Sequence, residues 1–128
     1  MKENLGLLLL RLVSGLTMLM AHGWPKLMDF TVKKDVFPDP LGVSSPVSLA
    51  LAVFAEVVCS LLIAAGFFTR WVAIPLVITM AVAFFIVHSA DPFGNKELAW
   101  VYMAMYGALA LTGPGGWSVD ALLRRKKD

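Results

Sequence analysis

The sequence predicts an all-α integral membrane protein with four transmembrane helices in an antiparallel bundle, a long first outer loop and a short amphipathic C-terminal segment. Two observations predict this class. Of the 128 residues, 59% are hydrophobic and only 16% are charged, and the mean hydropathy is +0.76. Most of the hydrophobic residues lie in four long segments. A soluble protein of this size needs polar residues to cover its large surface, so a water-soluble fold is excluded.

The apolar segments predict helices at about residues 5–24, 46–67, 70–88 and 96–112, all within a single domain that covers residues 1–128. A bilayer core asks for about 20 residues per helix. The first segment has Arg11 inside a run of leucines, which argues against a cleaved signal peptide. The second segment contains Glu56, and the third contains no charge.

The connections between the helices differ in length. Residues 66–70 and 88–97 predict tight turns, whereas residues 23–45 form a loop long enough to act as a lid or a docking surface. Ser45 followed by Pro46 predicts an N-cap with proline at the first helical position. The glycine-rich residues 112–116 end the fourth helix, and Ser118 is expected to cap a short helix at 119–123.

The distribution of Lys and Arg predicts the orientation in the membrane. Four spans place both termini on one side, and cytoplasmic segments carry an excess of these cations. That side has Lys2, Arg70, Arg124, Arg125, Lys126 and Lys127, against Lys26, Lys33, Lys34 and Lys96 on the other. We therefore expect cytoplasmic termini. The net charge of +2 gives no sign of nucleic-acid binding.

Two charges inside the spans need partners or water, because an unpaired charge in hydrocarbon is costly. Arg11 shares one helix face with Gly15, Met18 and His22. Glu56 belongs to a stripe that also contains Ser48, Ala52, Cys59 and Ile63. These faces predict a buried Arg11–Glu56 pair. Either the pair fixes the helix register, or Glu56 is a ligand or proton-handling carboxylate in a polar cavity.

A second group of polar side chains is expected near the outer ends of the helices. Its members are His22, Lys26, His88, Asp91, Glu97 and Tyr102. Three interpretations stay open: a metal site of His22, His88 and Glu97, a haem held between the two histidines, or a hydrogen-bonded network at the membrane interface. No residue is identified as catalytic, and the sequence has no nucleotide-binding motif. The single cysteine, Cys59, excludes dithiol chemistry within the chain.

With these residues placed, the chain resembles the DoxX family of small bacterial membrane proteins over about residues 5–123. The resemblance rests on the order and spacing of polar residues within apolar helices. The matching elements are Arg11 with Gly15, His22-Gly23 with Lys26, residues 39–42, Ala55-Glu56, Gly66 with Thr69-Arg70, His88 with residues 91–93, Lys96-Glu97 with Tyr102, and residues 112–115 with Ser118 and Asp120.

The resemblance implies a multi-pass protein of the bacterial cytoplasmic membrane that serves as an oxidoreductase subunit. It would act on or through a quinone or a similar lipophilic molecule held in the bundle. The alternative is a non-enzymatic membrane module that binds a lipophilic ligand or scaffolds partner proteins. The expected partners are the lipid bilayer, a soluble or membrane-bound redox protein, and a second copy of the chain. Because the chain has one cysteine, a redox role requires a quinone, a metal or a partner subunit.

Overall fold

The computed structural model describes residues 1–127, and most of these are helical, with no strand among them. The prediction of an all-α protein is therefore confirmed. The elements in chain order are α1 (Lys2–Met18), the π-helical turn η1 (Leu19–Gly23), α2 (Trp24–Met28), α3 (Phe30–Lys33), α4 (Ser45–Val53), the π-helical turn η2 (Phe54–Cys59), α5 (Ser60–Ala65), α6 (Thr69–Val82), the π-helical turn η3 (Ala83–Val87), the 3₁₀ turn η4 (Phe93–Asn95), α7 (Glu97–Thr112) and α8 (Val119–Lys127).

Three continuous helices are long and apolar enough to cross a membrane: Lys2–Met28, Ser45–Ala65 and Thr69–Val87. Each of them contains one of the π-helical turns. The first continues to Met28, beyond the predicted end at residue 24, because the chain stays helical through η1 and α2. Helix α7 has 16 residues, which corresponds to about 24 Å of the roughly 30 Å hydrocarbon core.

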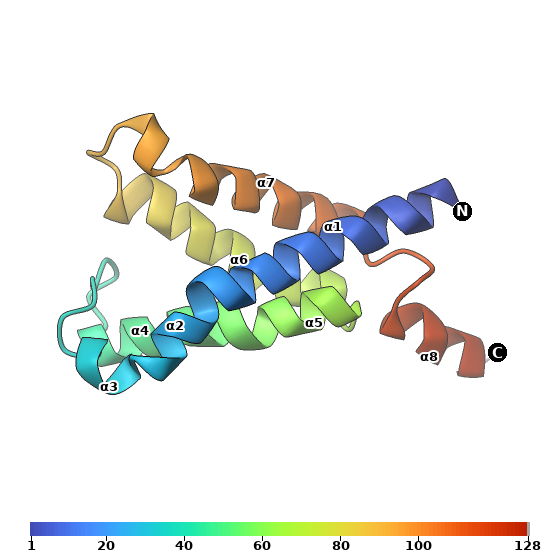
Figure 1. Cartoon of the computed structure of the whole chain (residues 1–128), viewed down its shortest axis with the longest axis horizontal. Helices are drawn as coiled ribbons and strands as arrows, with labels where there is room; N and C mark the ends of the chain where they lie inside the picture. The colour runs from blue at the N-terminus through green and yellow to red at the C-terminus, as the bar shows by residue number, and fades with distance from the viewer. Residues whose placement is uncertain (128) are drawn as a thin grey trace.

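The helices pack as two neighbouring pairs. Helix α1 lies along α5, and α6 lies along α7 (Figure 1). Gly15 brings α1 close to α5, since a Cβ at this position would lie 2.7 Å from the Ser60 carbonyl oxygen and 3.0 Å from the Ala64 nitrogen. The two pairs diverge toward the end that carries α3 (Figure 1).

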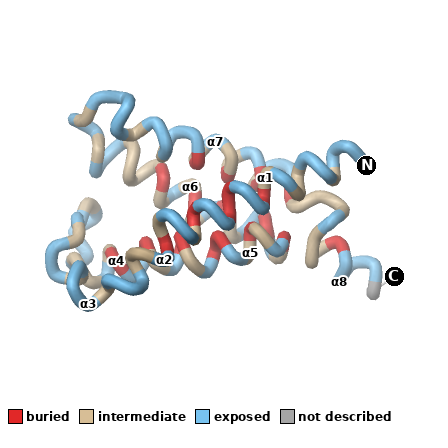
Figure 2. The backbone as a smooth tube through the Cα atoms, in the orientation of Figure 1, coloured by how far each residue is buried: buried red, intermediate tan, exposed pale blue. Residues whose placement is uncertain are grey.

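The distribution of apolar side chains suits a chain surrounded by lipid. The buried residues form a narrow band along the centre of the helices (Figure 2), which includes Met18, Ile63, Leu76 and Tyr106. Large apolar side chains also cover the outer helix faces; Leu111 is the extreme case and is 81% exposed. The polar backbone is satisfied within the helices, as hydrocarbon requires.

The turn between α5 and α6 is as tight as the sequence predicts. Gly66 ends α5 with φ 76°, and Phe68 precedes α6 with φ 51°. Both angles lie in the left-handed region, which glycine adopts without strain. The Asp120 carboxylate of α8 accepts hydrogen bonds from the backbone nitrogens of Phe68 (3.0 Å) and Thr69 (3.3 Å). The turn and α8 are therefore fixed to one another.

The long outer loop is ordered by a single carboxylate. Asp39 accepts hydrogen bonds from the nitrogens of Val43 (3.0 Å) and Ser44 (2.9 Å) and from the Ser48 hydroxyl (2.8 Å). The N-cap of α4 is Ser44 rather than the expected Ser45, and Pro46 occupies the second helical position. The cap lies one residue earlier because Ser44 has the non-helical φ of 98°, while its side chain accepts a hydrogen bond from the Val47 nitrogen.

The C-terminal segment also follows the sequence. Helix α7 ends at Thr112, and Gly113 follows with φ 77°. The Ser118 hydroxyl accepts a hydrogen bond from the Ala121 nitrogen at 3.1 Å, as expected of a cap. Helix α8 then continues to Lys127, beyond the predicted end at residue 123.

Candidate functional site

A cavity of about 620 Å³ lies among α4, η2, α6, η3 and α7, with α2 and the outer loop at one end. Its walls are mainly apolar, and its volume is typical of pockets that hold small organic molecules. The polar side chains that line it are His22, Lys26, Ser48, Glu56, Thr79, His88, Asn95, Lys96 and Tyr102.

A buried ion pair forms part of the cavity wall. The Lys26 ammonium lies 2.6 Å from a Glu56 carboxylate oxygen, and the two side chains are 22% and 4% exposed. Gly23 makes this contact possible, because any Cβ there would collide with the Glu56 backbone. Lys26 follows Gly23 by about one helical turn and so reaches across to the carboxylate.

The structure corrects the expected pairing of Arg11 with Glu56. Arg11 is buried, at 1% exposure, but its guanidinium donates to the carbonyl oxygens of Ala64 (3.1 Å) and Trp117. The reason is the register of the helices: Gly23, not Arg11, lies against Glu56. Gly23 is 12 residues from Arg11, about 18 Å along the helix. Arg11 instead binds the Ala64 carbonyl at the C-terminal end of α5, where the helix dipole favours a cation, and the Trp117 carbonyl before α8.

The π-helical turns border the cavity and bring functional groups to it. His22 lies in η1, Glu56 lies in η2, and His88 directly follows η3. A π-helical turn contains an extra residue, and such turns are frequent at functional sites. Sequence reasoning missed these turns, because no residue pattern in the three segments distinguishes them from ordinary α-helix.

Aromatic rings connect the cavity with the core. The rings of His22 and Tyr102 meet edge to face at 5.8 Å, and those of Tyr102 and Tyr106 stack at 5.8 Å with an interplanar angle of 11°. The Tyr106 hydroxyl donates to the Ser14 carbonyl at 2.8 Å. Tyr102 makes no such bond within the described residues, so its hydroxyl is available to a molecule in the cavity.

At the mouth of the cavity lie His88 and Lys96. The His88 Nδ1 is 2.7 Å from an Asp91 carboxylate oxygen, and the imidazole is 43% exposed. The Lys96 ammonium lies 4.6 Å from the centre of the Phe84 ring. Lys96 was not among the expected site residues. It directly precedes α7, the helix that contains Tyr102, and so lies at the outer end of that helix.

The outer polar cluster is thus gathered in part. His22, Lys26, His88 and Tyr102 line one cavity together with Glu56. Asp91 contacts this group only through His88, and Glu97 is exposed and does not line the cavity. Within residues 1–127, no group of three His, Cys, Asp or Glu side chains is arranged to hold a metal ion.

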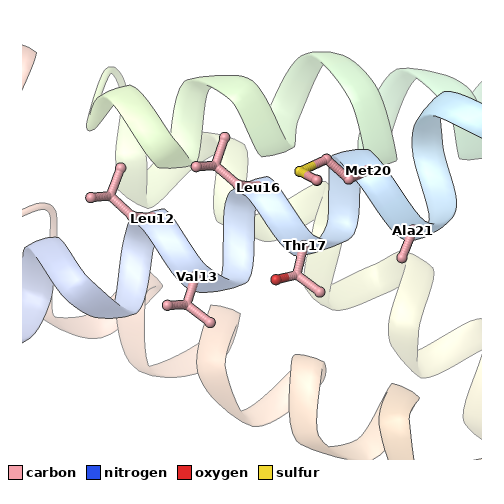
Figure 3. A pocket seen from close by; sticks show the side chains of 6 residues that line it. All are labelled: Leu12, Val13, Leu16, Thr17, Met20 and Ala21. Carbon is pink, nitrogen blue, oxygen red and sulfur yellow. The ribbon is translucent and has the colours of Figure 1, made fainter.

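A shallower hollow of about 390 Å³ lies on the outside of α1 (Figure 3). Its six lining residues are all exposed, and Thr17 is the one polar side chain among them: Leu12, Val13, Leu16, Thr17, Met20 and Ala21. With no ionisable group, this hollow matches a helix face in contact with hydrocarbon rather than a site for chemistry.

Comparison with known proteins identifies the family. The profile of the DoxX family matches residues 6–89. The chain belongs to the DoxX family. The matched DoxX region contains His22, Lys26, Glu56 and His88, whereas Lys96 and Tyr102 lie beyond it.

Two curated proteins are similar over most of the DoxX chain. Inner membrane protein YphA of Escherichia coli (strain K12) is 34% identical over 126 residues, which cover 89% of this chain and 88% of that protein. An uncharacterized protein of Haemophilus influenzae (strain ATCC 51907 / DSM 11121 / KW20 / Rd) is 31% identical over 110 residues, which cover 80% of each. No solved structure matches the chain. Together with the apolar helices, these similarities make the chain a bacterial DoxX membrane protein.

Proposed function

We propose that the chain crosses the cytoplasmic membrane four times, with both termini on the cytoplasmic side. Helix α7 supports a fourth crossing because it packs along α6 and exposes apolar side chains such as Leu98 and Leu111. Arg124 and Arg125 lie on α8, and Arg70 follows Thr69, whose nitrogen donates to Asp120 of α8. This group of arginines is in keeping with a cytoplasmic location of that end.

Single cysteines test this topology. A cysteine at Lys34 and a cysteine at Arg125, each introduced separately, are expected to react with a membrane-impermeant maleimide from opposite faces of intact cells and inverted vesicles. The native Cys59 is buried in the membrane-spanning part and serves as the unreactive internal control. Labelling of both positions from the same face would overturn the four-span topology.

We further propose that the cavity binds a lipophilic molecule with a polar head, a quinone or a molecule of similar shape, and that the protein acts as a subunit of a membrane oxidoreductase. The observation that carries this proposal is the Lys26–Glu56 ion pair in the wall of an otherwise apolar cavity. Apolar walls accept a ring and its tail, and a few placed polar groups fix the orientation of the head. Ionisable groups at membrane depth are otherwise rare outside functional sites.

The residues at the cavity fit the polar head of a quinone. Lys26 and the Tyr102 hydroxyl are hydrogen-bond donors for carbonyl oxygens, and Glu56 holds the lysine in position. His88, which is half-exposed and bonded to Asp91, can exchange protons with water at the mouth. A bound quinone would supply the redox chemistry. The electrons would come from a partner protein, because the chain has one cysteine and so no disulfide couple.

A second candidate is a non-enzymatic module that holds a lipophilic ligand for a partner protein. It is favoured by the mutual neutralisation of Lys26 and Glu56, which leaves the head-group end of the cavity without a strongly reactive group. The two candidates share the binding site and differ in whether the bound molecule changes its oxidation state.

Binding is tested with a short-chain ubiquinone analogue and gently purified protein. We expect saturable binding to the wild type and at least tenfold weaker binding to Lys26→Met. Lys33→Met is the matched control, because Lys33 also pairs with a carboxylate, Asp29, but on the exposed surface. Equal affinity in all three proteins would refute the cavity as the site. If binding is intact but membranes with and without the protein reduce the analogue equally fast, the non-enzymatic candidate is selected.

A further inference from the structure

The C-terminal helix α8 is a fixed part of the molecule. Its Asp120 nitrogen donates to the Gly66 carbonyl at 3.0 Å, while its Asp120 carboxylate caps the start of α6. Ala121 is buried, and Arg125 donates to the Gly116 carbonyl at 3.2 Å. Arg11, in the core, donates to the Trp117 carbonyl just before the helix. The orientation of α8 is therefore set by contacts with α1, α5 and α6.

These contacts leave much of the surface of α8 uncovered, and the uncovered surface combines apolar and basic groups. Leu122 and Leu123 are 52% and 43% exposed, and Arg124 and Arg125 follow them on the surface. Two exposed tryptophans lie close to α8 along the chain: Trp117 precedes its cap Ser118, and Trp71 follows Thr69, whose nitrogen donates to Asp120. A short helix of this composition is typical of segments that lie in the interface of a bilayer, with leucines toward the acyl chains and arginines at the head groups.

Among the described residues, the arginines at this end are not paired with carboxylates. The one carboxylate on α8, Asp120, accepts two backbone hydrogen bonds and forms no ion pair with the arginines. Arg70 is exposed and donates to the Thr112 carbonyl, an uncharged group. Arg70, Arg124 and Arg125 thus have no carboxylate within ion-pair distance in the part of the chain that the structure describes. A guanidinium binds phosphate oxygens with a planar pair of hydrogen bonds.

We propose that Arg70, Arg124 and Arg125 form a binding site for the phosphate groups of anionic phospholipids in the adjacent leaflet, with Leu122 and Leu123 inserted among the acyl chains. The site lies at the end of the molecule that carries α8, opposite the end that carries α3, whose last residue is Lys33 and which Lys34 directly follows (Figure 1). It is independent of the proposed quinone site, since none of its residues lines that cavity. Its ligand is a lipid rather than free phosphate, because the exposed leucines add an apolar contact that inorganic phosphate does not make.

The test measures lipid preference in mixed micelles of the full chain. Purified wild type is incubated with equal amounts of phosphatidylglycerol and phosphatidylcholine, and the retained lipids are counted by native mass spectrometry. Each arginine near an anionic surface contributes about fivefold to affinity. We therefore expect a clear preference for phosphatidylglycerol in the wild type and a loss of tenfold or more in the double variant R124Q/R125Q. Arg70→Gln alone is expected to lose about fivefold.

Two controls keep the result interpretable. K33Q/K34Q removes two charges from the opposite end, and its lipid preference is expected to equal that of the wild type. Glycerol 1-phosphate, which has the phosphate without acyl chains, is expected not to displace the lipid. Equal retention of both lipids by the wild type would overturn the proposal, as would an equal loss in K33Q/K34Q, which would indicate a response to net charge. Complete displacement by glycerol 1-phosphate would overturn the assignment of the ligand as a lipid.

Discussion

Breaking the Lys26–Glu56 ion pair from either side is expected to have unequal effects. Lys26→Met leaves a carboxylate that is only 4% exposed without its cation, and stranding such a charge costs about 3–5 kcal/mol of unfolding free energy. Glu56→Gln leaves a lysine that is 22% exposed. Its long side chain can turn its ammonium toward water, so we expect a loss of only about 1–2 kcal/mol.

The double variant K26M/E56Q removes both charges and is expected to be more stable than the sum of the single losses predicts. The coupling energy in this double-mutant cycle should be about 2–3 kcal/mol. The exposed pair Lys33–Asp29, with its charged atoms 3.7 Å apart, is the matched control and should couple by no more than about 1 kcal/mol. Both cycles are measured as unfolding free energies in detergent micelles at neutral pH.

Single-variant losses that add to the double-variant loss within about 0.5 kcal/mol would refute the reasoning. So would a larger loss in Glu56→Gln than in Lys26→Met.

Three further predictions concern the close helix contact, the cavity mouth and the outer loop. Gly15→Ala should cost about 1–3 kcal/mol of unfolding free energy, because its Cβ would lie 2.7 Å from a backbone oxygen of α5. Gly107→Ala is the control and should not destabilise, because a Cβ there would have nothing within 4 Å. Equal losses in the two variants would contradict the close contact. His88→Ala should weaken binding of the quinone analogue about tenfold. The thermal unfolding midpoint should stay unchanged, since polar groups at a water-exposed cavity mouth add little stability. A parallel loss of binding and stability would argue against a binding role. A hydrogen bond from the Ser48 hydroxyl, together with backbone amides, lowers the pKa of Asp39 below its ordinary 3.8. The loop is therefore stabilised at neutral pH and loses this contribution as the pH falls through the lowered pKa. Amide exchange in the loop should rise in that pH range in the wild type and stay level in Asp39→Asn.

Features that depend on neighbouring residues in the sequence were predictable. Gly66 ends a helix because the turn needs a left-handed residue, and Gly113 does the same after α7. Ser118 caps α8 as expected. Depth in the membrane follows from position along an apolar span. His22 and His88 were therefore expected at the same depth, and both line the cavity.

Features that depend on how two helices slide along each other were not predictable. The pairing of Arg11 with Glu56 was wrong, although both residues are buried. The register is decided by two close approaches, of α1 to α5 at Gly15 and of η1 to η2 at Gly23. These bring Lys26 to Glu56 instead. Hydropathy and periodicity show which face of each helix is buried, but they do not fix this longitudinal offset.

The π-helical turn η2 (Phe54–Cys59) has a consequence for how this chain tolerates changes in length. A π-helical turn holds its extra residue within one wide turn, so the α-helices before and after it keep nearly the phase of an uninterrupted helix. Deleting one residue, such as Val58, would restore an uninterrupted α-helix with nearly the same hydropathy and length. Such a chain would still enter the membrane as a helix, but the residues of η2, Glu56 among them, would no longer be presented to the cavity by the wide turn. Membrane insertion and the assembly of the cavity can therefore be separated by the removal of one amino acid.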